Sequence, residues 1–515
     1  MYILKHFPRL LFFILCFNIV LTSCSKEDTP PTPDPEEELP TPEEEGPVVL
    51  QNEVNDFVWL GLNEIYLWQD EIPNLADDKF SNTDDYYKFL NTYNSPESLF
   101  EDLLYNRSDV DKFSEIVTDY NDLENYLQGN SNSNGLDFRL YRIDDFSNDI
   151  IGVVRYVANN SDAATKDIKR GDFFISVDGQ QLTIDNYVNL LFGANNTYSL
   201  GMATISNGSI MPINKSVSLT KTDFSEDPIL INKVIETNGI KVGYMMLNQF
   251  INTTENNLNS KFADLKAQGV TELVLDLRYN GGGHGSTALA LSSMITGQFK
   301  DDIFYHNIWN TKYQSYWEDT DPEFLINRFS DKLNDGTAIN SLHLNKVYIL
   351  TTSNSASSSE LVINGLNPYI DVVQIGTTTF GKYVGSITVY DSPSFFSKTD
   401  INPNHTYAMQ PIILKAVNSI GVSDYFNGIT PDYTITYQTN SGSQVEGENI
   451  LNLGILGDES EPFLAKALSL IASGTAKTNY DKLSEIKGLD VEPIANTKEF
   501  SPFGKEMIPI IETID

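Results

Sequence analysis

The chain has 515 residues, of which 40% are apolar, so it is long enough for about three domains and a sizeable core. Its 34 Lys and Arg residues face 71 Asp and Glu residues, which gives a formal net charge of −37. This balance argues against nucleic acid and against basic patches on anionic lipid, because both partners require clustered positive charge. We therefore predict no nucleic-acid partner.

Cysteine and histidine usage limits the chemistry further. The only two cysteines, Cys16 and Cys24, lie in the first 24 residues, so the rest of the chain has no disulfide, thiolate nucleophile or Cys-based zinc site. The five histidines are widely spaced and form no HExxH pair. We predict no metal and no cofactor, while a carboxylate-bound Ca²⁺ or Mg²⁺ stays open.

The N-terminal residues 1–23 have the pattern of a secretory signal. Lys5 and Arg9 precede an apolar run over residues 10–20, which is too short to span a membrane as a stable helix. An uncleaved anchor helix is the alternative. The sequence Leu-Thr-Ser-Cys that ends at Cys24 resembles the lipobox of bacterial lipoproteins, and this resemblance implies cleavage before Cys24 and lipid attachment to its thiol.

Residues 24–50 are predicted to form a disordered acidic tether. Seven prolines and nine acidic residues fall within residues 25–47, which cannot bury enough apolar surface to offset their ordering entropy. Ser-Lys-Glu-Asp at residues 25–28 resembles the export tag of surface lipoproteins in the Bacteroidetes. We expect an outer-membrane lipoprotein exposed at the cell surface, attached to the membrane only through its lipid, with the periplasmic face as the alternative.

The remaining sequence predicts an α/β fold, mixed α+β overall. Apolar residues at helical spacing mark an N-terminal helical domain, short β-like runs between turn signals mark a β module, and alternating strands and helices mark a core with a mainly parallel sheet. An amphipathic helix near residues 461–473 begins the last part of the chain. The predicted parts are a helical domain at 51–128, a β module at 129–222, the core at 223–460 and a C-terminal helical segment with a tail at 461–515.

The β module resembles a PDZ domain. Residues 157–179 follow the family's pattern of a small helix and then a Gly-Asp turn leading to a strand that ends in Asp-Gly. Gly135, Leu136 and Phe138 fall where PDZ domains bind a peptide's C-terminal carboxylate while the peptide adds as a strand. Asp137 replaces the second glycine of that loop. The alternative is a small β module with a purely structural role.

Three segments of the core carry chemistry. Residues 276–283 end a strand in three glycines, residues 348–360 run from an apolar strand through hydroxyl residues into a helix, and residues 376–382 place a lysine in a loop. Taken alone, the serines would be helix caps and the lysine a surface residue. In this order, and with Gly-Ile-Thr-Pro-Asp at 428–432, they resemble the S41 family of C-terminal processing serine peptidases.

The resemblance implies a role for each matched residue. Ser357 aligns with the nucleophile and Lys382 with the general base. The lysine amine must be neutral to accept a proton, and burial near Phe380 would favour its neutral form. The backbone N–H groups of Ser358 and Gly282 would stabilise the oxyanion. The family often has a glutamine four residues after the lysine, which orients the lysine amine. This chain has Ser386 there, and its hydroxyl could take that role with a shorter reach.

Two functions follow as hypotheses. The first is a serine endopeptidase that uses a Ser/Lys dyad to hydrolyse exported or unfolded proteins with accessible C-termini, with His284 as the alternative base in place of Lys382. The second is a non-catalytic peptide- or glycan-binding surface lipoprotein on the same fold, which could use the aromatic stretch 305–317. The sequence does not indicate the oligomeric state.

Overall fold

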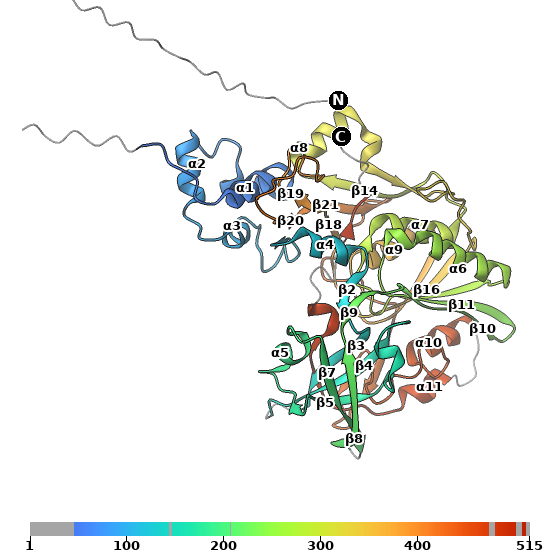
Figure 1. Ribbon diagram of the computed structural model, residues 1–515. Helices are drawn as coiled ribbons and strands as arrows, with labels where there is room; N and C mark the ends of the chain where they lie inside the picture. The colour runs from blue at the N-terminus through green and yellow to red at the C-terminus, as the bar shows by residue number, and fades with distance from the viewer. Residues whose placement is uncertain (1–45, 144–146, 207, 473–478, 501–506, 511–515) are drawn as a thin grey trace, which may run out of the picture.

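The computed structural model describes residues 46–143, 147–206, 208–472, 479–500 and 507–510. The predicted mixed α/β fold is confirmed: N-terminal helices, an antiparallel β module and an α/β core are distinct in Figure 1. The predicted signal peptide, Cys24 and most of the tether lie outside the described residues. None of the helices within the described ranges is both long and apolar enough to cross a membrane.

The core is built on a six-stranded sheet in the order β10-β11-β12-β16-β17-β22, parallel throughout except for the β10–β11 pair. Its strands are β10 (Ile229–Thr237), β11 (Ile240–Leu247), β12 (Glu272–Asp276), β16 (Lys346–Thr351), β17 (Asp371–Gly376) and β22 (Tyr433–Thr434). The alternation of strands and helices and the mainly parallel sheet that the sequence predicted for the core are present.

Helices cover both faces of this sheet (Figure 1). Along β11, Met245 packs in the cluster formed by α6 (Glu255–Ala267), α7 (Gly285–Thr296) and α9 (Ser358–Leu366), whereas Met246 packs in the cluster under α10 (Pro462–Ile471). Successive side chains of a strand point to opposite faces, so a sheet buried on both sides reads as a continuous apolar run.

Two smaller sheets and the N-terminal helices form the next part of the molecule. Helix α1 packs on these sheets through Phe57 and Val58, which share a cluster with Met409 and Leu414. The first sheet has the order β15-β14-β21-β18 and the second β1-β20-β19. The elements are α1 (Glu53–Ile65), α2 (Thr83–Leu90), α3 (Pro96–Asp102), β1 (Glu115–Val117), α4 (Tyr120–Leu127), β14 (Ile303–Trp309), α8 (Thr311–Thr320), β15 (Ile326–Arg328), β18 (Val384–Ser386), β19 (Val389–Tyr390), β20 (Ala408–Gln410) and β21 (Ile412–Asn418).

The β module is an antiparallel sheet in the order β25-β3-β4-β5-β7-β8, with β6 paired to β5. Its elements are β3 (Leu136–Arg142), β4 (Ile150–Val157), β5 (Phe173–Val177), β6 (Gln180–Gln181), α5 (Tyr187–Phe192), β7 (Thr197–Ser206), β8 (Ser209–Thr220) and β25 (Glu492–Asn496). Strand β25 comes from the C-terminal part of the chain, for which only a helical segment and a tail were predicted.

Short paired strands join these parts. Strand β13 (Gly283–His284) pairs in parallel with β26 (Met507–Ile508), so the tail also reaches the core. The remaining elements are β2 (Asn130–Ser133), β9 (Thr222–Ser225), β23 (Thr436–Gln438), β24 (Gln444–Glu446), α11 (Asn479–Ser484) and the 3-10 helices η1 (Gln69–Glu71), η2 (Pro73–Leu75), η3 (Ala163–Thr165), η4 (Asn252–Thr254), η5 (Pro322–Leu325) and η6 (Thr497–Phe500).

Candidate active site

Ser357 lies in a strained turn between β16 and α9. It is the N-cap residue of α9, with φ 60° and ψ −113°, a conformation that residues with a side chain rarely adopt. Its side chain is fully buried, and its Oγ has no hydrogen-bond partner in the part of the chain that the structure describes. A buried hydroxyl without a partner in a strained turn is typical of a functional residue rather than of a simple helix cap.

The serine-rich turn is bound to the glycine loop, so two segments that the sequence singled out separately lie together. The hydroxyl of Ser355 donates to the Leu277 carbonyl at 2.9 Å, and that of Ser358 donates to the Gly283 carbonyl at 2.8 Å. The Ser359 hydroxyl adds a bond to a carbonyl of the same loop. These buried hydrogen bonds explain why the turn needs several small hydroxyl residues in a row.

Glycine is required at position 283 by a close approach of backbone. Gly283 has φ 131°, and a Cβ there would lie 2.1 Å from the Phe250 carbonyl oxygen. The neighbouring Gly282 N–H donates to Asn280 Oδ1 at 2.9 Å. The Gly282 N–H, predicted to stabilise an oxyanion, is thus engaged within its own loop in this conformation, whereas Ser358 begins α9, where first-turn N–H groups lack intrahelical acceptors.

Lys382 lies in the loop between β17 and β18 and is fully buried. Its Nζ is 5.0 Å from the centroid of the Phe113 ring, a cation–π distance. The loop is bound to the serine turn, because the Phe380 N–H donates to the Ser355 carbonyl at 3.0 Å. The segment 428–432 also holds this loop, because the N–H of Thr379 donates to the carbonyl of Ile429 at 3.1 Å.

Glu360 joins the serine turn to the lysine loop. Its Oε2 accepts the backbone N–H groups of both Ser357, at 2.8 Å, and Lys382, at 2.9 Å. Its Oε1 accepts the N–H of Gly381 at 2.7 Å and the hydroxyl of Thr379. One buried carboxylate therefore fixes the backbones of the predicted nucleophile and the predicted base beside each other.

The charge of Glu360 is finely balanced. Burial raises the pKa of its carboxyl to about 7, although its four hydrogen bonds favour the charged form. The three backbone groups around it are obligatory donors, so the ionised carboxylate is the form that satisfies them all.

Ser386, which stands where the family often has glutamine, lies fully buried on β18. Gln410 at the end of β20 donates to its Oγ at 3.4 Å, and Thr388 donates to the other end of the same amide at 3.0 Å. The structure thus places a buried glutamine, from 24 residues further along the chain, beside Ser386.

His284, the alternative base, is the N-cap residue of α7 next to the glycine loop. Burial lowers the pKa of its imidazole to about 4, so the ring is neutral near pH 7. Because Ser357 Oγ has no partner in the described ranges, neither His284 nor Lys382 is hydrogen bonded to it in this conformation.

The Asp-Leu-Arg part of the glycine motif has a structural role. The Arg278 guanidinium is fully buried and pairs with Asp276 and Glu461, each at 2.6 Å. Glu448 accepts from Arg170 of the β module at 2.7 Å and lies 3.4 Å from Arg278. This ion network binds the β module to the core beneath the site.

The residues predicted to bind a peptide carboxylate are engaged within the β module. The N–H of Gly135 donates to the Ser133 hydroxyl, and that of Leu136 donates to the Asn134 side chain, both at 3.0 Å. The Phe138 side chain is buried in the core of the module. Strand β25 lies along β3, the strand to which a peptide was expected to add, and peptide binding by these residues stays a prediction.

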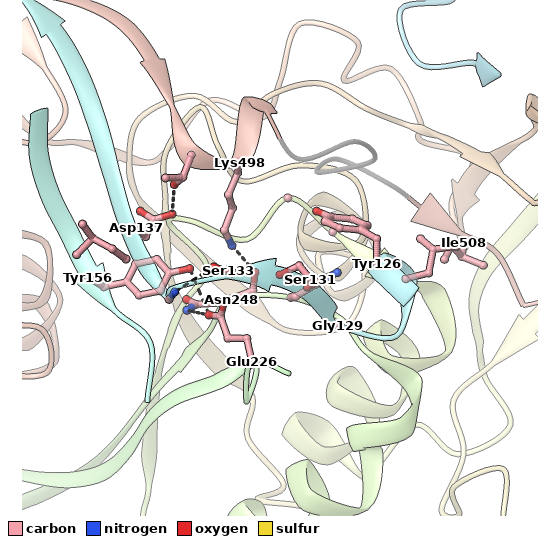
Figure 2. Close-up of a pocket in the computed structure, with 18 residues that line it drawn as sticks. Tyr126, Gly129, Ser131, Ser133, Asp137, Tyr156, Glu226, Asn248, Lys498 and Ile508 are labelled. Carbon is pink, nitrogen blue, oxygen red and sulfur yellow. Dashed lines mark hydrogen bonds between the residues drawn. The ribbon is translucent and has the colours of Figure 1, made fainter. Parts of the chain in front are cut away.

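A cavity of about 110 Å³ lies between the β module, the glycine loop and the tail (Figure 2). Burial raises the pKa of the Glu226 carboxyl and lowers that of the Lys498 amine, so it disfavours the charged form of both. Neither Ser357 nor Lys382 lines this cavity. Its wall includes Gly135, Leu136, Asp137, Tyr156, Glu226, Asn248, Gly281, Gly282, Gly283, Lys498 and Ile508. Among the described residues no cluster of three or more His, Cys, Asp or Glu side chains is arranged to hold a metal ion.

The sequence motif included Glu360 but gave it no role, and the roles of Gln410 and of the tail were not predicted at all. Glu360 had a readable signal, since a glutamate three residues after an N-terminal serine is a capping-box pattern. Gln410 and the tail had no such signal, because their positions depend on strand pairing across long sequence separations.

Comparison with known families identifies two matching domains. The Peptidase family S41 domain matches residues 241–435, and the Peptidase S41 N-terminal domain matches residues 53–114. A carboxy-terminal-processing protease of Bartonella bacilliformis is 25% identical over 301 residues, 56% of this chain and 59% of that protein. A carboxyl-terminal-processing protease of Picosynechococcus is 26% identical over 168 residues, 33% of this chain and 35% of that protein. The similarity thus spans less than two thirds of either relative.

The fold has a counterpart among solved structures. A crystal structure from Bacteroides fragilis NCTC 9343, assigned to the S41 proteases, superposes with a TM-score of 0.62 at 24% identity, covering 81% of this chain and 97% of that one. This similarity supports the fold over nearly the whole of that protein.

Proposed function

Because this chain carries both domains of peptidase family S41, the family that the motifs of its core predicted, we propose that it is a serine endopeptidase of the C-terminal-processing type. The observation that supports this most directly is the shared carboxylate of Glu360, which holds the Ser357 turn and the Lys382 loop together. Its substrates would be protein segments with accessible C-termini.

In the proposed reaction, Ser357 Oγ attacks the peptide carbonyl while Lys382 accepts the hydroxyl proton. The N–H of Ser358 and an N–H of the glycine loop stabilise the tetrahedral oxyanion. Lys382 then returns the proton to the leaving amine, and water hydrolyses the acyl-enzyme by the same route. Because Ser357 is fully buried here, the reaction requires an opening that admits the substrate.

The test compares two serines of the same segment. We expect Ser357→Ala to abolish hydrolysis of an unstructured fluorogenic peptide and labelling by a fluorophosphonate probe, while Ser353→Ala, at an exposed position, changes neither. Both variants should melt at the wild-type temperature. Hydrolysis by pure Ser357→Ala at the wild-type rate would rule out the assignment.

The base is tested by Lys382→Ala and His284→Ala. We expect loss of hydrolysis in the first and retention in the second. If His284 were the base instead, kcat/KM would fall below pH about 4, following the lowered pKa of its imidazole, and His284→Ala would be inactive.

The non-catalytic alternative gains no support from the aromatic stretch 305–317. Tyr305 and Trp309 are buried, and Tyr313 and Trp317 pack against the cluster beneath the N-terminal helices. Most of this stretch therefore serves packing rather than a glycan-binding surface.

We also propose that the protein is an exported lipoprotein anchored through Cys24, on the sequence pattern alone. Replacement of Cys24 by serine should abolish incorporation of labelled fatty acid and move the protein from the membrane fraction to the soluble fraction. Protease treatment of intact cells should degrade a surface-exposed form and spare a periplasmic one.

A further inference from the structure

The C-terminal tail extends the β module as a strand. Strand β25 pairs antiparallel with β3, with Glu492 opposite Arg142 and Asn496 opposite Arg139. It therefore runs toward residues 135–137, in the orientation of a peptide that adds to a sheet edge. Ala495 is buried in the module core, so this is a packed contact rather than a loose one.

The tail then continues toward the glycine loop. The Thr497 hydroxyl donates to Asp137 at 2.6 Å, and the Lys498 ammonium donates to the carbonyls of Tyr279, at 2.7 Å, and Asn248, at 3.0 Å. Figure 2 shows Lys498 pointing from the tail into the cavity between the module and the core. The chain thus passes the position where a peptide carboxylate would end and does not stop there.

The last described residues lie at the edge of the predicted site. Strand β26 pairs in parallel with β13, whose Gly283 carbonyl accepts the Ser358 hydroxyl. On its other side the tail contacts β18, because a Cβ at Gly385 would lie 3.3 Å from Pro509 and 3.4 Å from the Met507 carbonyl. Residues 507–510 therefore lie between β13, which is bound to the serine turn, and β18, which follows Lys382 in the chain.

We infer that residues 492–500 and 507–510 occupy the track along which a polypeptide substrate reaches Ser357, and that the substrate binds as an extended strand on β13 after displacing residues 507–510. This inference rests on the proposed peptidase function and specifies the surface that receives the substrate. If the tail occupies the substrate's place, Ser357 is expected to be buried, as the structure shows it to be. The partner that fits is an unfolded or extended segment, since a folded domain could not replace a single strand.

The first test weakens the tail where it packs. Met507 is 1% exposed in the core cluster, so Met507→Asp should expel β26, whereas Ile455→Asp adds the same charge at a position that is 69% exposed. If the open state makes up about a tenth of the wild-type population, we expect KM for an unstructured fluorogenic peptide to fall about tenfold in Met507→Asp. We expect kcat to be unchanged, and Ile455→Asp to match the wild type.

The second test uses the full chain and does not depend on whether Met507→Asp folds. Hydrogen exchange is measured on Ser357→Ala with and without a saturating unstructured peptide, whose binding is verified by fluorescence anisotropy. We expect exchange at residues 507–510 to become faster on binding, while His284 on β13 stays protected. The bound peptide should itself gain protection.

The outcomes separate this inference from the proposed function. Hydrolysis by the wild type with equal KM in a folded Met507→Asp, or unchanged exchange at residues 507–510 with peptide bound, overturns the inference alone. Absence of hydrolysis in the wild type and in Met507→Asp overturns the proposed function and the inference together.

Discussion

Glu360 is the residue on which the geometry of the predicted dyad depends. Three backbone N–H groups and one hydroxyl donate to its two oxygens, and two of these N–H groups belong to Ser357 and Lys382. A carboxylate accepts at both oxygens, whereas a carboxamide presents donors at one end. A glutamate rather than a glutamine is therefore required at this position, although burial disfavours its charged form.

Glu360→Gln should lose both stability and activity. The amide NH₂ would face N–H groups and leave at least one buried donor unsatisfied, at a cost of about 1–3 kcal/mol. At pH about 4.5 we expect a lower free energy of unfolding in urea, and at pH about 7.5 at least tenfold slower peptide hydrolysis. Glu459→Gln makes the same chemical change at an exposed position and should leave both quantities unchanged. Equal activity of the two variants would contradict this role.

The raised pKa of Glu360 also predicts a pH dependence of stability. Its pKa is about 7 when folded and 4.5 as an ordinary glutamate, so between these values the folded state binds more protons. Its contribution is fully present below pH 4.5 and is lost as pH rises through 7, by about 3 kcal/mol. The difference in unfolding free energy between wild type and Glu360→Gln should therefore shrink from pH 4.5 to 7.5. A constant difference would show that Glu360 does not titrate there.

At the scale of elements, the glycine loop is positioned by a backbone contact between Gly283 and Phe250 that leaves no room for a side chain at position 283. Gly283→Ala would place its Cβ 2.1 Å from the Phe250 carbonyl oxygen at φ 131°, so β13 must move away from Phe250. Gly421→Ala has a comparable positive φ of 86° but meets nothing within 4 Å, so it isolates the backbone strain of about 1–2 kcal/mol. We expect Gly283→Ala to cost about 1–3 kcal/mol more in urea unfolding and to slow hydrolysis. Equal destabilisation of the two variants would exclude the steric explanation.

Elements with a local signal were predictable from sequence. Helix α9 and strands β11, β12, β16 and β17 follow from apolar runs of the right length and from their flanking turns. The turn that carries Ser357 was located because hydroxyl residues follow a buried strand. Strands β25 and β26 were missed, since short strands in a polar tail have no periodic pattern and form only through partners more than two hundred residues away.

The same limit applies within the site. Ser357 and Lys382 were found by a motif resemblance, not by physical pattern, because a lone serine and a lone lysine resemble a cap and a surface residue. The role of Asp276 and Arg278 was not foreseen, because the partners Glu448 and Glu461 lie 170 and 183 residues further along the chain from Arg278. Sequence patterns report local geometry, and long-range charge pairing leaves no such pattern.

At the scale of the whole molecule, one ion network joins the β module to the core. The guanidinium groups of Arg170 and Arg278 share Glu448, which also accepts the Tyr279 hydroxyl at 2.5 Å. Burial opposes ionisation of Glu448, but the two guanidinium groups outweigh it and hold the pKa of its carboxyl at about 2. The module that carries β3 is thus fixed against the sheet that carries the glycine loop.

Glu448→Gln should therefore uncouple the two parts. Removal of one partner of a buried ion pair leaves uncompensated charge and costs about 3–5 kcal/mol. We expect earlier unfolding in urea and faster hydrogen exchange in β3 and β4, whereas Glu446→Gln, at an exposed position of β24, should match the wild type. The lowered pKa also predicts the direction of the pH dependence. The stability that Glu448 contributes is present above pH 4.5 and is lost as pH falls toward 2. The unfolding free energy of the wild type should therefore approach that of Glu448→Gln in acid. A gap between the two proteins that widens in acid would contradict the network, because protonation of the wild-type carboxyl removes the same charge as the substitution.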